Sequence, residues 1–340
     1  MNTAPAGAAL VFLLTVLPAG AQNVKITPLG SHAGELCAND RATIFEDPTG
    51  VRILYDVGGT VTGADDARIG TIHAVLLSHA HGDHIGDQKL KALGAGTCAN
   101  AERVPAGPNS MTAEIAAAKN AAIVMQGDMA PFIGRKVQNI TGKPVTPCPQ
   151  TDGATTVPVA APCRSVLHLG GTFIVKSANA AKGVAITIVY ASHGNNVPLS
   201  LLSEAHRVSL APDDTSIVLG PPTGYVVKFT NGLVAYLSGD TGVHTEMKTV
   251  VKDLHHANLA LLNQGPSAVD GVASAYAMNE LVRPVSVILT HVNEAATEGG
   301  KLRPLSRTAA VIKLLKAKPH LAISERTMEF DGKGMCVAGC

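Results

Sequence analysis

Short runs of hydrophobic residues, separated by glycine and proline, dominate the first part of the chain. The runs at 24–27, 42–45, 52–55 and 74–77 are rich in valine and isoleucine, and turn-forming residues separate them. Runs of this length and composition are typical of strands that are buried on at least one face. We therefore expect these four segments to form strands of one sheet.

The second half of the chain repeats this pattern. A run of largely β-branched residues covers 184–191, and the runs 225–229 and 233–237 flank an Asn-Gly pair at 231–232. Asn-Gly between two apolar runs is the strongest short-range signal for a β-hairpin. Two more short apolar runs predict the strands 259–262 and 285–289.

Helical patterns mostly follow the strands in each half. We expect five helices, with Asn109-Ser110 able to cap the second: 87–95, 111–119, 245–254, 267–281 and 307–315. A stretch rich in proline, threonine and glycine lies within a long excursion at about 94–170 and interrupts one domain rather than dividing two. Strands followed by helices in both halves favour an α/β fold, the αββα four-layer sandwich, over residues 22–340.

Composition excludes several classes of protein. The 27 Lys and Arg residues balance 26 Asp and Glu residues, so bulk charge predicts neither nucleic-acid binding nor attachment to acidic membranes. Only 16% of residues are charged while 46% are hydrophobic, which excludes a disordered chain. The longest apolar run, 8–17, is half the ~20 residues needed to cross a bilayer, so we expect no stable membrane insertion.

That apolar run and the cysteines predict an exported protein. The small residues Ala19-Gly20-Ala21 follow it, as at the end of a signal peptide cut before Gln22. We expect residues 1–21 to be this peptide and the protein to be periplasmic or extracellular; otherwise it is cytoplasmic and the run is a buried strand. Six cysteines without a CxxC pair suit disulfides, and Cys148 with Cys163 is a plausible pair in one loop.

Four potential metal ligands crowd into six residues at the end of the expected strand 74–77. They are His79, His81, Asp83 and His84. The first two alternate on an extended segment and so point to one side, while the other two follow Gly82 and can reach a second position. Imidazole and carboxylate are ligands that borderline divalent metals accept.

Three later strands end in the same kinds of side chain. His193 follows the strand 184–191, Asp240 follows 233–237 and His291 follows 285–289. Each could alone be a capping residue or a satisfied histidine. Strand ends carrying such ligands can converge on one cleft, so together they predict a metal site.

In these motifs and their order, residues 24–340 resemble the metallo-β-lactamase superfamily of metal-dependent hydrolases. The resemblance implies two divalent ions, with zinc favoured over manganese or iron. It also implies that Asp83 both binds a metal ion and orients a hydroxide that bridges the two ions. It also implies a ligand set: His79, His81 and His193 on one ion, Asp83, His84 and His291 on the other, and Asp240 between them. Asp56, at the end of the strand 52–55, would orient a ligand histidine, and Asp87 would either do the same or cap the next helix.

Because it has an aspartate at position 240, the sequence resembles the esterases, lactonases, thioesterases and phosphodiesterases of that superfamily. Within these, it resembles a lactonase-like branch of general hydrolases. We expect a small-molecule substrate whose ester, lactone or phosphodiester bond is cleaved. A β-lactamase-like amide hydrolase, a mononuclear-iron oxidoreductase and a metallated binding module remain open, as do the oligomeric state and the general acid. Candidates for that acid are Tyr225 and several histidines: His32, His206, His244, His255 and His256.

Overall fold

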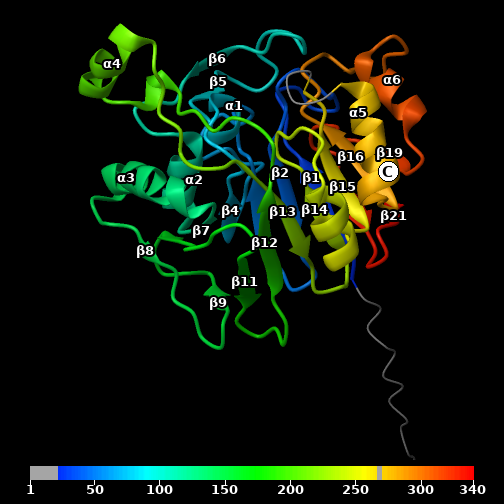
Figure 1. Ribbon diagram of the computed structural model, residues 1–340, viewed down its shortest axis with the longest axis horizontal. Helices are drawn as coiled ribbons and strands as arrows, with labels where there is room; N and C mark the ends of the chain where they lie inside the picture. The colour runs from blue at the N-terminus through cyan, green and yellow to red at the C-terminus, as the bar shows by residue number, and fades with distance from the viewer. Residues whose placement is uncertain (1–21, 266–269) are drawn as a thin grey trace, which may run out of the picture.

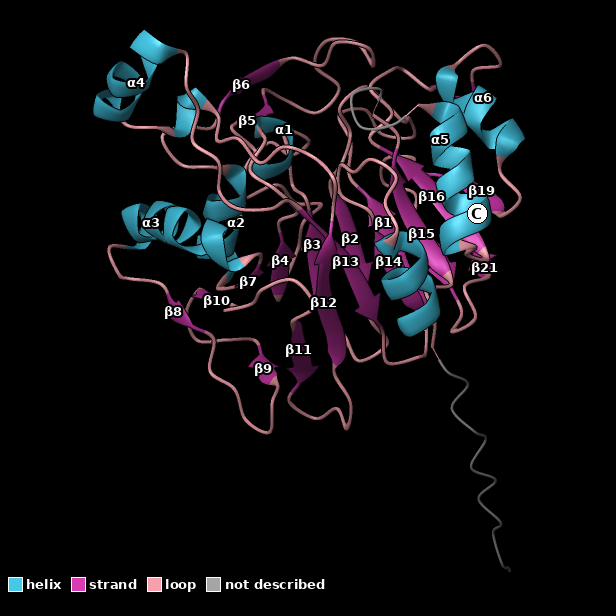
Figure 2. Cartoon of the chain, in the orientation of Figure 1, coloured by secondary structure: helices cyan, strands magenta, loops and turns pink. Residues whose placement is uncertain are grey.

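Two sheets packed face to face form the centre of the molecule, and helices cover their outer faces (Figures 1 and 2). The computed structural model describes residues 22–265 and 270–340. The expected signal peptide, 1–21, and the first residues of the expected helix 267–281 lie outside the described residues. The arrangement confirms the expected αββα sandwich.

Within residues 22–265 and 270–340, the first sheet has nine strands, most of them from the first half of the chain. In spatial order they are β21 (Cys336–Ala338), β20 (Met328–Phe330), β1 (Val24–Pro28), β2 (Thr43–Glu46), β3 (Arg52–Tyr55), β4 (Ala74–Leu76), β7 (Ala122–Val124), β10 (Cys163–Arg164) and β8 (Thr146–Pro147). The four strands expected at the start of the chain are present within a residue or two of their predicted bounds.

The second sheet has eight strands in the part of the chain that the structure describes. In spatial order they are β19 (Lys318–Leu321), β16 (Ser286–Thr290), β15 (Leu259–Asn263), β14 (Val234–Leu237), β13 (Thr223–Lys228), β12 (Val184–Tyr190), β11 (Thr172–Ser177) and β9 (Thr155–Val157). The predicted hairpin is β13 with β14, whose turn contains Gly232 at φ +97°. Two short pairs lie outside the sheets: β5 (Gln88–Leu90) with β6 (Arg103–Pro105), and β17 (Thr297–Glu298) with β18 (Lys301–Leu302).

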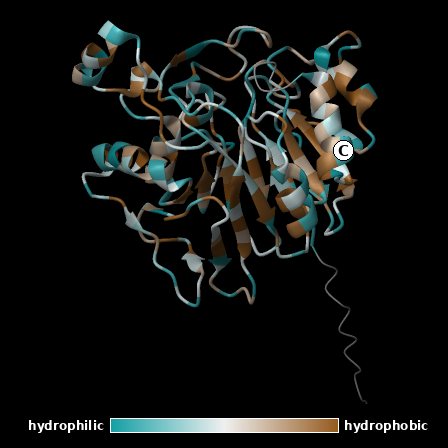
Figure 3. Cartoon of the chain, in the orientation of Figure 1, coloured by the Kyte–Doolittle hydropathy of each residue, from teal (hydrophilic) through white to brown (hydrophobic). Residues whose placement is uncertain are grey.

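Strand alternation separates the core into layers. On β3, Ile53 and Tyr55 face the second sheet, whereas Leu54 packs on the outer side with the helices. The hydrophobic side chains accordingly gather in the strands, as the brown central ribbons of Figure 3 show. Because both faces of each sheet carry hydrophobic side chains, both faces must be covered. The other sheet covers the inner face and helices cover the outer face.

The helices and helical turns fall into two groups. On the first sheet's side and in the loops above it lie α1 (Gly82–Ile85), α2 (Met111–Lys119), η1 (Gly127–Met129), α3 (Ala130–Thr141), η2 (Leu199–Leu201), α4 (Glu204–Leu210) and η3 (Ala211–Asp213). On the second sheet's side lie η4 (Met247–Leu254), α5 (Gly271–Tyr276), η5 (Ala277–Val282) and α6 (Arg307–Leu314). Helix α2 has its predicted bounds, and the Ser110 side chain accepts from the backbone N–H of Ala113.

The helix expected over 87–95 was wrong. Its first half is strand β5, which pairs with β6, and Leu90 is buried with its backbone N–H bonded to the carbonyl of Val61. Gly94 then adopts φ +72°, which a right-handed helix does not allow. Long-range pairing therefore overrides the local helical preference in this segment.

Three disulfides join all six cysteines. They are Cys37–Cys98, Cys148–Cys163 and Cys336–Cys340. The pairing expected for the loop cysteines is present, and it holds the segment between β8 and β10 together. Among the helices of residues 22–265 and 270–340, none combines the length and the apolar character that a membrane crossing needs.

Candidate metal centre

All seven side chains predicted as metal ligands lie where the two sheets meet at one edge. His79 and His81 occupy the loop after β4, and Asp83 and His84 lie in α1, which begins directly after that loop. The remaining three follow β12, β14 and β16: His193, Asp240 and His291. Because β12, β14 and β16 run in the same direction within the second sheet, their carboxyl ends meet.

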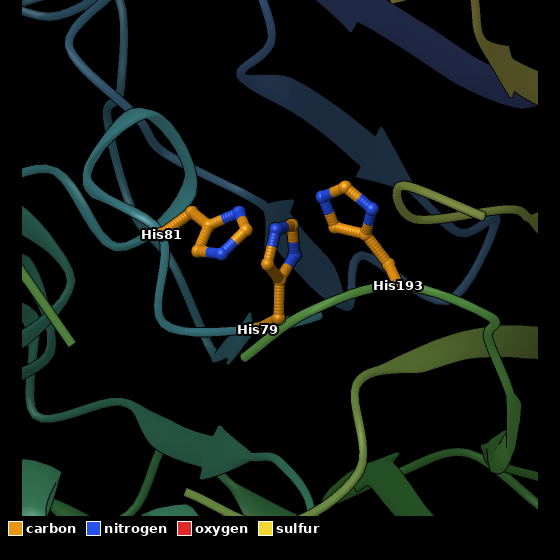
Figure 4. A group of neighbouring side chains, drawn as sticks. All are labelled: His79, His81 and His193. Carbon is orange, nitrogen blue, oxygen red and sulfur yellow. The ribbon is translucent and has the colours of Figure 1, made fainter. Parts of the chain in front are cut away.

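Three histidines form the first group, which we call the first position. One ring nitrogen each of His79, His81 and His193 lies within 4.8 Å of the other two (Figure 4). Burial lowers the pKa of all three imidazoles, most strongly that of His79, so they are neutral with free lone pairs. Nε2 of His79 is buried and lacks a hydrogen-bond partner among the described residues. These features fit a divalent metal ion.

The second position is formed by Asp83, His84 and His291, and it is more negatively charged. Although burial disfavours a charged His84, the carboxylates of Asp240, Asp56 and Asp83 outweigh this effect and raise the pKa of His84 to about 10. Nε2 of His84 is buried and forms no hydrogen bond within the described part of the chain. A negatively charged pocket with a buried ring nitrogen that forms no hydrogen bond fits a cation.

Asp240 lies between the two positions. Its Oδ1 atom is 3.4 Å from Nε2 of His84 and 3.3 Å from Nε2 of His291, and its Oδ2 atom is 3.7 Å from Nε2 of His193. Asn263 fixes the carboxylate by donating to Oδ1 at 3.0 Å. Each carboxylate oxygen thus faces a different position, as a shared ligand would require.

Asp56, at the end of β3, contacts the ligand candidate His84 and the neighbouring Ser78. The hydroxyl of Ser78 donates to Oδ2 of Asp56 at 2.6 Å, and the backbone N–H of Ser78 donates to Oδ1 at 2.8 Å. Nδ1 of His84 lies 2.8 Å from Oδ2. Asp56 also has φ +39°, a backbone conformation that is rare for a residue other than glycine and is held here by its surroundings.

Several supporting residues carried no signal in the sequence. Oδ1 of Asn195 accepts from the backbone N–H of Ala80 at 2.7 Å, so it fixes the loop between His79 and His81. Gly265 leaves room for His291, because a Cβ atom there would lie 2.8 Å from the ring. Asn195 lies two residues after His193, and this position in the sequence does not by itself predict its contact with Ala80.

Arg41 is the residue of the centre that the sequence interpretation missed altogether. It precedes β2, its side chain is 2% exposed, and its guanidinium contacts both Asp83 and His291. Arg41 and Asp83 also line a polar cavity of about 300 Å³ that Asp87 and Arg103 border. This cavity places space for a small molecule beside the second position.

Within the described residues, no residue considered as a general acid forms a hydrogen bond or ion pair with the seven ligand candidates. The Tyr225 hydroxyl is fully buried and donates to the backbone carbonyls of Leu77 and Val124. His206 and His256 are exposed, and the His244 ring packs on Tyr190. Asp87 follows α1 rather than capping a helix, and it accepts from the hydroxyl of Ser200.

Comparison with known proteins shows what the chain is similar to. The sequence signature described as the Metallo-beta-lactamase superfamily matches residues 42–119, a range that holds Asp56 and the four ligand candidates of the loop and α1. The signature and the fold are those of the metallo-beta-lactamase superfamily.

Relatives named as metal-dependent hydrolases match most of the length of this chain. A UPF0173 metal-dependent hydrolase of Koribacter versatilis is 23% identical over 303 residues, covering 88% of this chain and 97% of the relative. One of Roseiflexus castenholzii is 24% identical over 257 residues, covering 73% and 77%. The structure of Igni18, a metallo hydrolase of Ignicoccus hospitalis, shares the fold with a TM-score of 0.55 and 21% identity, over 91% of this chain and 99% of Igni18.

Proposed function

We propose that this protein hydrolyses an ester, lactone or phosphodiester bond of a small molecule at a centre that holds two divalent metal ions. That it is a metal-dependent hydrolase follows from the superfamily signature and from relatives with that name. The finer proposal rests on one observation: seven histidine and carboxylate side chains from both sheets converge on two adjoining positions.

Each side chain has a distinct task in this proposal. The two divalent ions, for which we favour zinc over manganese or iron, would supply a hydroxide at neutral pH and would polarise the substrate oxygen. The neutral imidazoles of His79, His81 and His193 would hold the first ion, and Asp240 would be shared. Asp83 would orient the nucleophile, and its side chain, which is 43% exposed beside the polar cavity, supports this role.

The alternatives are a β-lactamase-like amide hydrolase and a mononuclear-iron oxidoreductase. The carboxylate of Asp240 favours ester, lactone or phosphodiester cleavage over β-lactam cleavage because it adds negative charge between the two positions. The second position, with its own complete set of three ligand side chains, favours a pair of ions over a single iron.

Export to the periplasm or the extracellular space also stays a proposal. Its support is that every cysteine of the described residues is in a disulfide, and disulfides persist in oxidising compartments.

Metal analysis combined with a substrate panel tests the function. The panel contains lactones, aryl esters, bis-aryl phosphates and a chromogenic cephalosporin. We expect exhaustive chelation to abolish hydrolysis and added zinc or manganese to restore it. His79→Gln should abolish turnover, whereas the control His168→Gln, which removes an exposed imidazole, should not. Hydrolysis that survives verified metal removal would contradict the mechanism, and one bound iron with oxygen uptake would favour the oxidoreductase.

A further inference from the structure

The guanidinium of Arg41 lies among the ligands of the second position. Its Nη2 atom contacts Oδ2 of Asp83 and lies 2.5 Å from Nε2 of His291. Its Nη1 atom donates to the backbone carbonyl of Asn39 at 3.0 Å, which anchors the group from the other side. Arg41 therefore bridges two of the three side chains that a second metal ion would use.

Arg41 uses the same ligand atoms that a metal ion would need. A guanidinium has only donors, so Nε2 of His291 must accept its hydrogen through the ring lone pair. A metal ion at the second position would require that lone pair and an oxygen of Asp83. The contacts of Arg41 and the binding of a second ion therefore exclude each other.

Charge strengthens this exclusion. A guanidinium stays protonated in proteins, so Arg41 cannot be neutralised to make room for a divalent cation. Its side chain is 2% exposed, and the repulsion of a nearby ion is screened little by water. Nε2 of His84 forms no hydrogen bond in the described residues, so the guanidinium occupies the second position only in part.

The first position differs in this respect. Among the described residues, the hydrogen bonds and ion pairs of His79, His81 and His193 involve no arginine or lysine. Histidine rings surround the carboxylate of Asp240, which faces both positions, and within the described residues it has no lysine or arginine partner. A divalent ion can therefore enter the first position without displacing a resident cation.

We propose that Arg41 is a resident cation that competes with the second metal ion. The folded chain then binds one divalent ion tightly at the first position, and binds a second only when Arg41 leaves Asp83 and His291. This inference rests on the proposed function in taking these side chains as a metal centre. It adds that the two-metal form is reached only at higher metal concentration.

Zinc titration of the metal-free protein, followed by calorimetry and by metal analysis after dialysis, tests the inference. We expect two binding steps in the wild type, with the first much the tighter. Arg41→Met should strengthen the second step by at least about tenfold, or about 1.4 kcal/mol, and leave the first unchanged. Arg103→Met is the matched control, because Arg103 lines the same cavity without contacting a ligand, and it should change neither step.

Two outcomes have opposite meanings. Two ions bound with equal affinity by the wild type, and unaffected by Arg41→Met, would overturn the role of Arg41 and leave the proposed function intact. A wild type that binds no divalent ion would overturn the proposed function itself.

Crystals of the wild type keep the test decisive even if Arg41→Met does not fold. Anomalous diffraction at one equivalent of zinc should show the ion at the first position only. At saturating zinc, the second ion should appear together with a displaced Arg41. A second ion present while Arg41 still contacts Asp83 and His291 would overturn the proposal.

Discussion

Oδ2 of Asp56 lies 2.8 Å from Nδ1 of His84, and this contact turns the other ring nitrogen, Nε2, towards the second position. A carboxylate only accepts, so Nδ1 keeps its hydrogen when Nε2 offers its lone pair. We expect Asp56→Asn to weaken the second zinc-binding step by about 10- to 100-fold. The amide has one acceptor oxygen for the donors from Ser78 and His84, so the ring orientation is lost.

Zinc titration of the folded variant checks this expectation. Asp47→Asn is a matched control, because Asp47 is an equally buried carboxylate that accepts from Thr49 and Thr230 at the opposite end of β3. Equal effects of the two variants on zinc binding would mean that Asp56 acts through general stability alone.

Asp240→Asn should separate the two positions. Three neutral imidazoles suffice for the first ion, so one equivalent of zinc should remain. The second ion should be lost or weakened, because the repulsion between two divalent ions is less compensated without the carboxylate. If Asp240 only caps the turn after β14, the variant loses about 1 kcal/mol of stability and keeps both metal-binding steps. Metal analysis of the folded variant at saturating zinc distinguishes these cases.

The carboxylate of Asp240 also leads us to rank the substrates. We expect cephalosporin turnover to be weak beside the best ester or lactone of the panel, because Asp240 places a negative charge between the two positions. Comparison of kcat/KM values for the same preparation is the measurement. Cephalosporin turnover within tenfold of the best ester would reverse the ranking.

The disulfides should stabilise the fold in the order of the loops that they close. The loops span 61, 15 and 4 residues for Cys37–Cys98, Cys148–Cys163 and Cys336–Cys340. The chain-entropy relation gives about 4, 3 and 2 kcal/mol of unfolding free energy. Denaturant unfolding of the three double alanine variants measures these losses. A loss for Cys336–Cys340 that exceeds that for Cys37–Cys98 would show that loop closure does not dominate.

The sequence predicted the parts of the structure that depend on local pattern. The strand runs, the Asn-Gly hairpin and the cap at Ser110 are encoded within a few residues and are present where expected. Four of the seven ligand candidates were found because they lie within six residues after one apolar strand, and the other three because each follows an apolar strand. Their metal roles stay predictions, but the fold brings them together because strand direction brings their ends to one edge.

Features that depend on contacts between distant segments could not be predicted. The helix α3 was missed because Pro131 and Gly134 obscure its pattern, although a proline suits the first turn of a helix. Residues 88–90 form a strand only because β6 lies beside them. Nothing around Arg41 in the sequence indicates that its side chain reaches Asp83 and His291, which follow 42 and 250 residues later.

The division of the ligand candidates between the two sheets has a consequence for the order of assembly. His79, His81, Asp83 and His84 come from the first sheet, and His193, Asp240 and His291 come from the second. Neither half alone offers all three donors of either position. A partly synthesised chain can thus bind an ion with only some of the seven ligand candidates. Complete metal binding requires that both sheets have packed together. Tight zinc uptake during refolding would then report the completion of the native interface between the sheets.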